Sequence, residues 1–229
     1  MAQGLFITGT DTGCGKTEIT LGLMHRLQQH GDVVLGMKPV ASGAERTADG
    51  LRNQDALRIQ AQCSRPLSYD QVNPFAYAPP IAPHLAAAAV AEPIDIQHVG
   101  EIYSQLSEAA DCVLVEGVGG WSVPLNERET LGDLARYLNL PVVLVVGLRL
   151  GCINHALMTE ACIRMSGCRL LGWVGNLVEP GMEAQAGNIS TLNDRLAVPC
   201  LGVVPWMEEA SPGSVAAYLD DDLLQSSGQ

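Results

Sequence analysis

Six short apolar runs constrain the fold of this chain more than any other feature. Each run is rich in Val, Leu and Ile and is continuous, without alternation of apolar and polar residues. Continuous runs are typical of strands buried on both faces, and such strands belong to parallel sheets whose crossovers are helices. Helical stretches between the runs, at residues 17–30, 131–138 and 154–165, supply those crossovers. The runs occupy residues 5–8, 33–38, 112–115, 142–146, 170–174 and 200–204.

This pattern predicts a doubly wound, mainly parallel α/β sheet flanked by helices. A chain of 229 residues that is 47% hydrophobic suits one domain, spanning residues 1–229. Residues 39–99 interrupt the rhythm as an insertion with a polar loop, a short helix at 55–62, a proline-rich stretch at 73–83 and an alanine-rich helix. An insertion of this length is usually functional. After Pro212 we expect a final helix and then a few frayed acidic residues, which include Asp220, Asp221 and Asp222.

The charge balance excludes some classes of partner. The chain has 13 basic and 25 acidic side chains, for a formal charge of −12. Such a surface repels the phosphates of nucleic acids and anionic lipids, so we expect no nucleic-acid or membrane partner. The apolar stretches are too short to span a bilayer, which predicts a soluble, cytoplasmic protein. The seven cysteines form no CxxC pair, so neither a disulfide framework nor a zinc site is indicated, and most of them are expected to be buried.

A glycine-rich segment directly follows the first apolar run. It reads G-T-D-T-G-C-G-K-T over residues 9–17 and leads into a helical pattern. A strand, a glycine-rich turn and a helix together favour a phosphate-binding loop, in which backbone N–H groups and the helix N-terminus face phosphate oxygens. Lys16 then reaches the β and γ phosphates and the Thr17 hydroxyl binds Mg²⁺. The strict motif needs glycine at position 10, where this chain has Thr10, so the loop is a variant form.

Three further charged residues are candidates for the same site. Glu116 follows the third run, beside the expected loop strand, where a carboxylate can hold the Mg²⁺ of a nucleotide. Lys38 ends the second run and is, with Lys16, one of only two lysines in the chain. A compact ammonium suits a point contact with a phosphoryl oxygen. Asp55 opens the short helix of the insertion.

With these residues together, the sequence resembles the dethiobiotin synthetase family over essentially its whole length. The joint order and spacing of the matching stretches are specific, and the variant loop is this family's form. The stretches are G-T-D-T-x-x-G-K-T at 9–17, M-K-P-V-A-S-G at 37–43, G-L-R-N-x-D-A at 50–56, V-N-P at 72–74, P-H at 83–84, V-E-G-x-G-G-W at 115–121, L-G-C-I-N-H at 150–155, G-W-x-x-N at 172–176 and P-W at 205–206.

The resemblance implies an ATP- and Mg²⁺-dependent ligase of biotin biosynthesis that acts as a homodimer. Its substrates are 7,8-diaminononanoate, CO₂ (or bicarbonate) and ATP. One amine captures CO₂ as a carbamate, ATP phosphorylates the carbamate, and the second amine closes the ureido ring and expels phosphate. Catalysis of this kind is mostly positioning and electrostatic stabilisation.

The resemblance also implies roles for individual residues. Lys38, Lys16 and Thr12 are the catalytic candidates, and Lys38 bridges the carbamate and the γ-phosphate. Thr17, Asp55 and Glu116 surround the metal. Thr12, Lys38 and Ser42 face the substrate, whose carboxylate meets Gly151, Cys152 and Asn154 across the dimer interface. The nucleotide-binding candidates are Gly13, Cys14, Gly15, Lys16, Thr17, Glu18, Asp55, Glu116, Gly117, Val118, Gly119, Asn176, Leu177, Pro205, Trp206 and Met207.

The sequence departs from the family pattern in its last part. Pro212 stands where the pattern has an acidic contact to adenine, and Glu208 or Glu209 is an alternative for that contact.

Two other functions use the same kind of sheet. One is a nucleotide-switch ATPase of the partitioning or septum-positioning kind, which generally carries an additional lysine where this chain has Thr10. The other is the synthetase part of a cobyrinate-type amidotransferase, whose glutaminase domain has no counterpart here.

Overall fold

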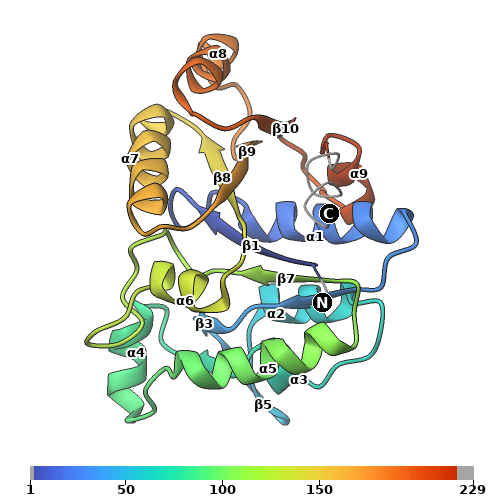
Figure 1. The fold of residues 1–229 in the computed structure, drawn as a ribbon, viewed down its shortest axis with the longest axis vertical. Helices are drawn as coiled ribbons and strands as arrows, with labels where there is room; N and C mark the ends of the chain where they lie inside the picture. The colour runs from blue at the N-terminus through green and yellow to red at the C-terminus, as the bar shows by residue number, and fades with distance from the viewer. Residues whose placement is uncertain (1–2, 221–229) are drawn as a thin grey trace.

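The computed structural model describes residues 3–220, and its centre is a parallel sheet (Figure 1). Six strands pair in the order β10-β9-β8-β1-β7-β2, and every pairing between neighbours is parallel. The order in which the chain adds strands to the sheet changes direction beside β1, whose neighbours are β8 on one side and β7 on the other. The strands are β1 (Gln3–Gly9), β2 (Val34–Met37), β7 (Cys112–Glu116), β8 (Val142–Leu148), β9 (Leu170–Leu177) and β10 (Cys200–Val204).

Alternate residues of each strand enter the cores on the two faces of the sheet. Leu5 and Ile7 of β1 belong to the core under α1 and α9, whereas Phe6 points to the opposite face. The opposite face is covered by α5 and α6 and, beside β8 and β9, by α7 and α8 (Figure 1). Both faces are therefore apolar, which explains why the strands read as continuous runs. The helices are α1 (Lys16–Gln29), α2 (Gln54–Gln62), α3 (Tyr69–Val72), α4 (Pro83–Val90), α5 (Ile96–Glu108), α6 (Leu131–Leu138), α7 (Cys152–Met165), α8 (Gln185–Arg195) and α9 (Pro212–Ala216).

The segment between β2 and β7 contains two small sheets as well as helices. Strand β3 (Val40–Ser42) pairs in parallel with β6 (Phe75–Tyr77), and β4 (Glu45–Thr47) forms a hairpin with β5 (Gly50–Arg52). Helix α2 packs on α1, and α4 packs on β3 and β6. The segment therefore lies beside the carboxyl end of β2.

The six apolar runs were correctly predicted as strands of one parallel sheet, and the helices at 17–30, 131–138 and 154–165 correspond to α1, α6 and α7. Helix α5 was missed, although its buried residues Ile96, Val99, Ile102 and Leu106 have helical spacing. Most cysteines were expected to be buried; Cys14, Cys112 and Cys152 are buried, Cys63, Cys168 and Cys200 are partly buried, and Cys162 on α7 is exposed. Helix α9 agrees with the expected final helix, and residues 221–229 of the acidic tail lie outside the described residues.

In residues 3–220, no helix combines the length and the apolar character needed to cross a lipid bilayer.

Buried side chains of the central strand β8 should contribute to the free energy of unfolding. Leu144 is fully buried in β8, so Leu144→Ala leaves a cavity and should lower the free energy of unfolding by about 3 kcal/mol. Met165 is 86% exposed at the end of α7, and Met165→Ala should change stability by no more than about 0.5 kcal/mol. Urea denaturation of both variants checks this, and equal losses would contradict the described core.

Candidate active site

The polar candidates gather at one edge of the sheet because β1, β7 and β2 are adjacent and parallel. The glycine-rich loop follows β1, Glu116 is the last residue of β7, and Lys38 directly follows β2. Parallel strands end at the same edge, and ligands of open α/β sheets bind there, next to the point where the strand order reverses. The expectation that Glu116 lies on the strand beside the loop strand is correct.

The loop between β1 and α1 depends on glycine at two positions. Gly13 and Gly15 have φ angles of 79° and 86°, in the left-handed region. A Cβ on Gly15 would also lie 2.0 Å from the side-chain nitrogen of Asn176. The Thr10 N–H donates to the carbonyl of Val145 at 3.0 Å and ties the loop to β8. The loop is thereby held over the N-terminus of α1.

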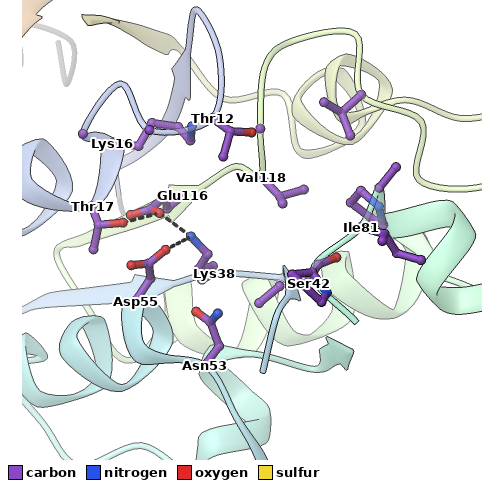
Figure 2. A pocket seen from close by; sticks show the side chains of 18 of the residues that line it. Thr12, Lys16, Thr17, Lys38, Ser42, Asn53, Asp55, Ile81, Glu116 and Val118 are labelled. Carbon is purple, nitrogen blue, oxygen red and sulfur yellow. Dashed lines mark hydrogen bonds and ion pairs between the residues drawn. The ribbon is translucent and has the colours of Figure 1, made fainter. Parts of the chain in front are cut away.

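Lys38 makes the central ion pairs of the site (Figure 2). Its Nζ donates to Asp55 Oδ2 at 2.7 Å and to Glu116 Oε1 at 2.6 Å. The same Glu116 oxygen accepts a hydrogen bond from Thr17 Oγ1 at 2.9 Å. The Lys38 and Glu116 side chains are 6% and 0% exposed, whereas Asp55 is 42% exposed. Four candidates from separate parts of the sequence are thus joined in one network, which is buried except at Asp55.

The network keeps Lys38 and Asp55 charged. Burial acts to lower the pKa of Lys38, but the charges of Glu116 and Asp55 and their hydrogen bonds outweigh it, so this pKa lies above its ordinary value. Burial acts to raise the pKa of Asp55, but the charge of Lys38 and its hydrogen bond outweigh it, and this pKa lies below its ordinary value. An ammonium and a carboxylate therefore face each other at neutral pH.

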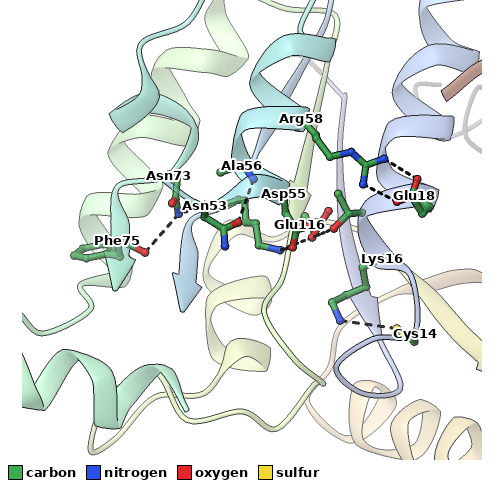
Figure 3. A network of polar contacts seen from close by, with 12 residues as sticks. Cys14, Lys16, Glu18, Asn53, Asp55, Ala56, Arg58, Asn73, Phe75 and Glu116 are labelled. Carbon is green, nitrogen blue, oxygen red and sulfur yellow. Dashed lines mark hydrogen bonds and ion pairs between the residues drawn. The ribbon is translucent and has the colours of Figure 1, made fainter. Parts of the chain in front are cut away.

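Two asparagines for which no role was predicted position the charged residues (Figure 3). Asn73 Nδ2 donates to the backbone carbonyl of Lys38 at 2.6 Å. Asn53 caps α2 by accepting from the Ala56 N–H at 3.2 Å, which orients Asp55 in the first turn. The Tyr69 hydroxyl joins them, since it donates to Asn73 Oδ1 and accepts from the Asn53 N–H. Both asparagines stand in motifs that the sequence had singled out, so their polar character there was the available signal.

A cavity of about 740 Å³ opens over this network. One part is polar and contains the loop and the ion pairs. Another part is bordered by apolar side chains from the insertion and from the segment after β7, among them Ala41, Ile81 and Val123. The predicted site residues that line the cavity are Thr12, Gly13, Gly15, Lys16, Thr17, Glu18, Lys38, Ser42, Asp55, Glu116, Val118 and Gly119.

A second cavity, of about 210 Å³, lies on the other side of the loop. It contains the late residues that the resemblance assigns to the base: Asn176, Leu177, Pro205, Trp206 and Met207. Asn176 Nδ2 also donates to the carbonyl of Cys14 at 3.0 Å and so supports the loop. Neither Glu208 nor Glu209 lines this cavity, and both are exposed. The contact of either glutamate with the base stays a prediction.

Some predicted residues line neither cavity. The Cys14 side chain is fully buried beneath the loop, and Gly117 is buried behind Glu116. Gly151, Cys152 and Asn154 also line neither cavity and lie at the start of α7. Gly151 and Asn154 are exposed there, and Cys152 is buried.

The polar part of the site suits a divalent cation that is also held by phosphate. Glu116 Oε2 is buried and finds no hydrogen-bond partner among the described residues, and Glu116 lies beside the Thr17 hydroxyl and Asp55. Within the described part of the chain, no group of three or more His, Cys, Asp or Glu could hold a metal by itself. Mg²⁺ usually takes one or two carboxylates together with substrate phosphates. The donor set fits Mg²⁺ of that kind.

Removing Lys38 should destabilise the fold because Glu116 would remain buried without its cation. At pH 7 we expect Lys38→Met to lower the free energy of unfolding by about 3 kcal/mol. The double variant with Glu116→Gln should lose less than the sum of the two single variants. The pKa of Asp55 lies below its ordinary 3.8, so its stabilising contribution is present above pH 3.8 and is lost as the pH falls further. Urea titrations in acid should therefore show a smaller gap between Lys38→Met and the parent, and a constant gap would contradict this network.

Known proteins with a related sequence cover nearly all of the chain. A family model described as an AAA domain matches residues 3–214. The ATP-dependent dethiobiotin synthetase BioD of Pseudomonas aeruginosa strain UCBPP-PA14 is 54% identical over 216 residues, which is 94% of this chain and 95% of that protein. The enzymes of the same name from Cellvibrio japonicus and Xanthomonas oryzae pv. oryzae are 49% and 48% identical, and each match covers 96% of the relative and 95% or 93% of this chain.

Similar solved structures support the fold of this chain and do not bear on its function. The MinC:MinD cell division protein complex of Aquifex aeolicus matches with a TM-score of 0.62 at 15% identity, over 100% of this chain and 97% of that chain. The septum site-determining protein MinD of Pyrococcus horikoshii, complexed with Mg-ADP, matches with a TM-score of 0.57 at 15% identity, over 96% and 87%. The likeness to septum-positioning ATPases is thus one of architecture. The sequence relatives decide the family, and the chain belongs to the ATP-dependent dethiobiotin synthetases.

Proposed function

We propose that this protein closes the ureido ring of dethiobiotin from 7,8-diaminononanoate, CO₂ and ATP in biotin biosynthesis. The observation that carries the proposal is the position of Lys38, whose ammonium lies beside the phosphate loop and opens to the same cavity as Ser42 and Thr12. The reaction brings a carbamate and a triphosphate together, and a buried cation between them offsets their repulsion. Because the reaction consumes ATP, we expect it in the cytoplasm.

The loop and the start of α1 are suited to the triphosphate. The backbone of residues 13–16 and the Lys16 ammonium would hold the oxygens of the triphosphate. Lys16 is buried in the loop, and its ammonium donates to the carbonyl of Asp11 at 2.9 Å. Thr17, Asp55 and Glu116 would hold Mg²⁺, which when bound neutralises phosphate charge. The base would lie against Asn176 and Pro205–Met207 in the second cavity.

The apolar part of the larger cavity is suited to an aliphatic diamine. Ala41, Ile81 and Val123 provide apolar surface for a hydrocarbon chain. Ser42 Oγ is buried, has no hydrogen-bond partner in the described part of the chain and belongs to a residue that lines the cavity, so it can meet an amine or the carbamate formed from it. Lys38 would contact the carbamate and the transferred phosphoryl group, and the nearby second amine would then attack.

We also propose that the active unit is a homodimer of one-domain chains. Gly151, Cys152 and Asn154 lie outside both cavities, at the exposed start of α7. The neighbouring Leu150 is 99% exposed, and Met158 on the same helix is 53% exposed. An exposed helix N-terminus with apolar neighbours is suited to reach the substrate carboxylate of a second copy.

The proposed activity has a direct assay. Purified protein with 7,8-diaminononanoate, bicarbonate, ATP and Mg²⁺ should form dethiobiotin and ADP in a diamine-dependent way. Lys38→Gln should lower kcat by about 100-fold or more with little change in the Kd of ADP, because it removes a cation needed mainly in the transition state. Failure of the parent protein to form dethiobiotin would refute the function, and a variant with normal kcat would remove Lys38 from the catalytic residues.

The shared site can be tested by mixing two defective variants. Lys38→Gln damages the site on its own chain, and Asn154→Asp places a negative charge beside the carboxylate in the site of the partner. If subunits mix at random, about half of the dimers are mixed and each has one intact site of two, so about one quarter of the parent activity should return. No recovery after verified subunit exchange would show that Asn154 serves its own chain.

A further inference from the structure

The two cavities meet at a narrow set of residues. Among residues 3–220, only Gly13, Gly15 and Glu18 line both of them. A nucleotide with its phosphates in the first cavity and its base in the second must pass its ribose across this boundary. The two glycines have no side chain, so Glu18 provides the side-chain contact there.

The Glu18 side chain is fixed by an arginine from another element (Figure 3). Arg58 on α2 donates from Nη1 to Oε1 at 2.5 Å and from Nη2 to Oε2 at 2.7 Å. The two side chains are 39% and 31% exposed, for Arg58 and Glu18 respectively, so the pair lies at the mouth of the site. Arg58 itself lines the larger cavity. A two-bond arrangement of this kind sets the direction of the carboxylate.

The chemistry of the pair fits a sugar better than a phosphate. An unpaired carboxylate in the first turn of α1 would repel a triphosphate held by the same helix N-terminus. Arg58 balances that charge, and each Glu18 oxygen keeps a free lone pair for another donor. A ribose carries two vicinal hydroxyl groups that can donate to those lone pairs.

We propose that Glu18 recognises the ribose hydroxyls of the nucleotide and that Arg58 is its positioning residue. This inference rests on the nucleotide site of the proposed function, and it adds a specificity for ribonucleotides over deoxyribonucleotides. A different role for the pair would be a simple link between α1 and α2, which would affect stability without regard to the sugar.

Binding of two nucleotides that differ only in the ribose separates these roles. We would measure the Kd of ADP and of 2′,3′-dideoxy-ADP, both with Mg²⁺, by isothermal titration calorimetry. The parent protein should favour ADP by about 10-fold, as expected for hydrogen bonds to a charged acceptor. Glu18→Ala should bring the ratio close to one, and Glu18→Gln, which keeps the side-chain shape, should give an intermediate ratio. Arg58→Gln should lower the ratio while leaving the Glu18 carboxylate present.

A matched control is an ion-paired arginine away from both cavities. Arg136 on α6 pairs with Asp133 at 3.0 Å, and Arg136→Gln should keep the parent ratio. Thermal unfolding of each variant reports whether it is folded. Equal Kd values for the two nucleotides in the parent, or an unchanged ratio in Glu18→Ala, would overturn the proposal.

The outcome is separate from that of the ligase assay. Loss of sugar discrimination in Glu18→Ala supports the ribose contact even if the parent makes no dethiobiotin. Formation of dethiobiotin without any preference for ADP over its dideoxy analogue would overturn the ribose contact alone.

Discussion

The Lys38 ammonium lies almost without exposure between two carboxylates, and much of the site is arranged to make this possible. A buried cation is tolerated only when it is paired and hydrogen-bonded. Glu116 provides one partner from the end of a central strand, and Asp55 provides the other from the first turn of α2. The backbone of Lys38 is held independently, by Asn73 and by the carbonyl of Val72. The lysine is therefore fixed at both its main chain and its charged end.

The sheet and the insertion contribute different parts of this arrangement. Strands β1 and β7 place the phosphate loop and Glu116 side by side through parallel register, in which Ile7 is opposite Glu116. The insertion brings α2 over α1 and closes the cavity with apolar side chains such as Ile81. The sheet thus fixes the groups suited to phosphate and metal, and the insertion adds the surface suited to a hydrocarbon chain. The relatives that share the sequence are synthetases, whereas the MinD proteins share only the sheet and its flanking helices.

Much of the fold could be predicted from the sequence because burial on both faces leaves a continuous apolar run for each central strand. The loop residues and Glu116 were predictable for a related reason, since parallel strands end at one edge. The small pairs β3–β6 and β4–β5 were not, because three-residue strands have too few positions to show a period. The cap that Asn53 makes is local, whereas the role of Asn73 depends on a hydrogen bond to Lys38, 35 residues away, which no local pattern reveals. The pair of Glu18 and Arg58 joins residues 40 apart and was equally hidden.

The burial of both lysine side chains has a practical consequence. The chain contains only two lysines, and both are buried at the site, while its other cationic side chains are arginines and histidines. Both ammonium groups are almost unexposed and Lys38 is ion-paired, so amine reagents should react slowly with the lysines of the folded protein. The rate of amine labelling at the two lysines would therefore report opening or unfolding of the site, and a ligand that stabilises the site should slow it further.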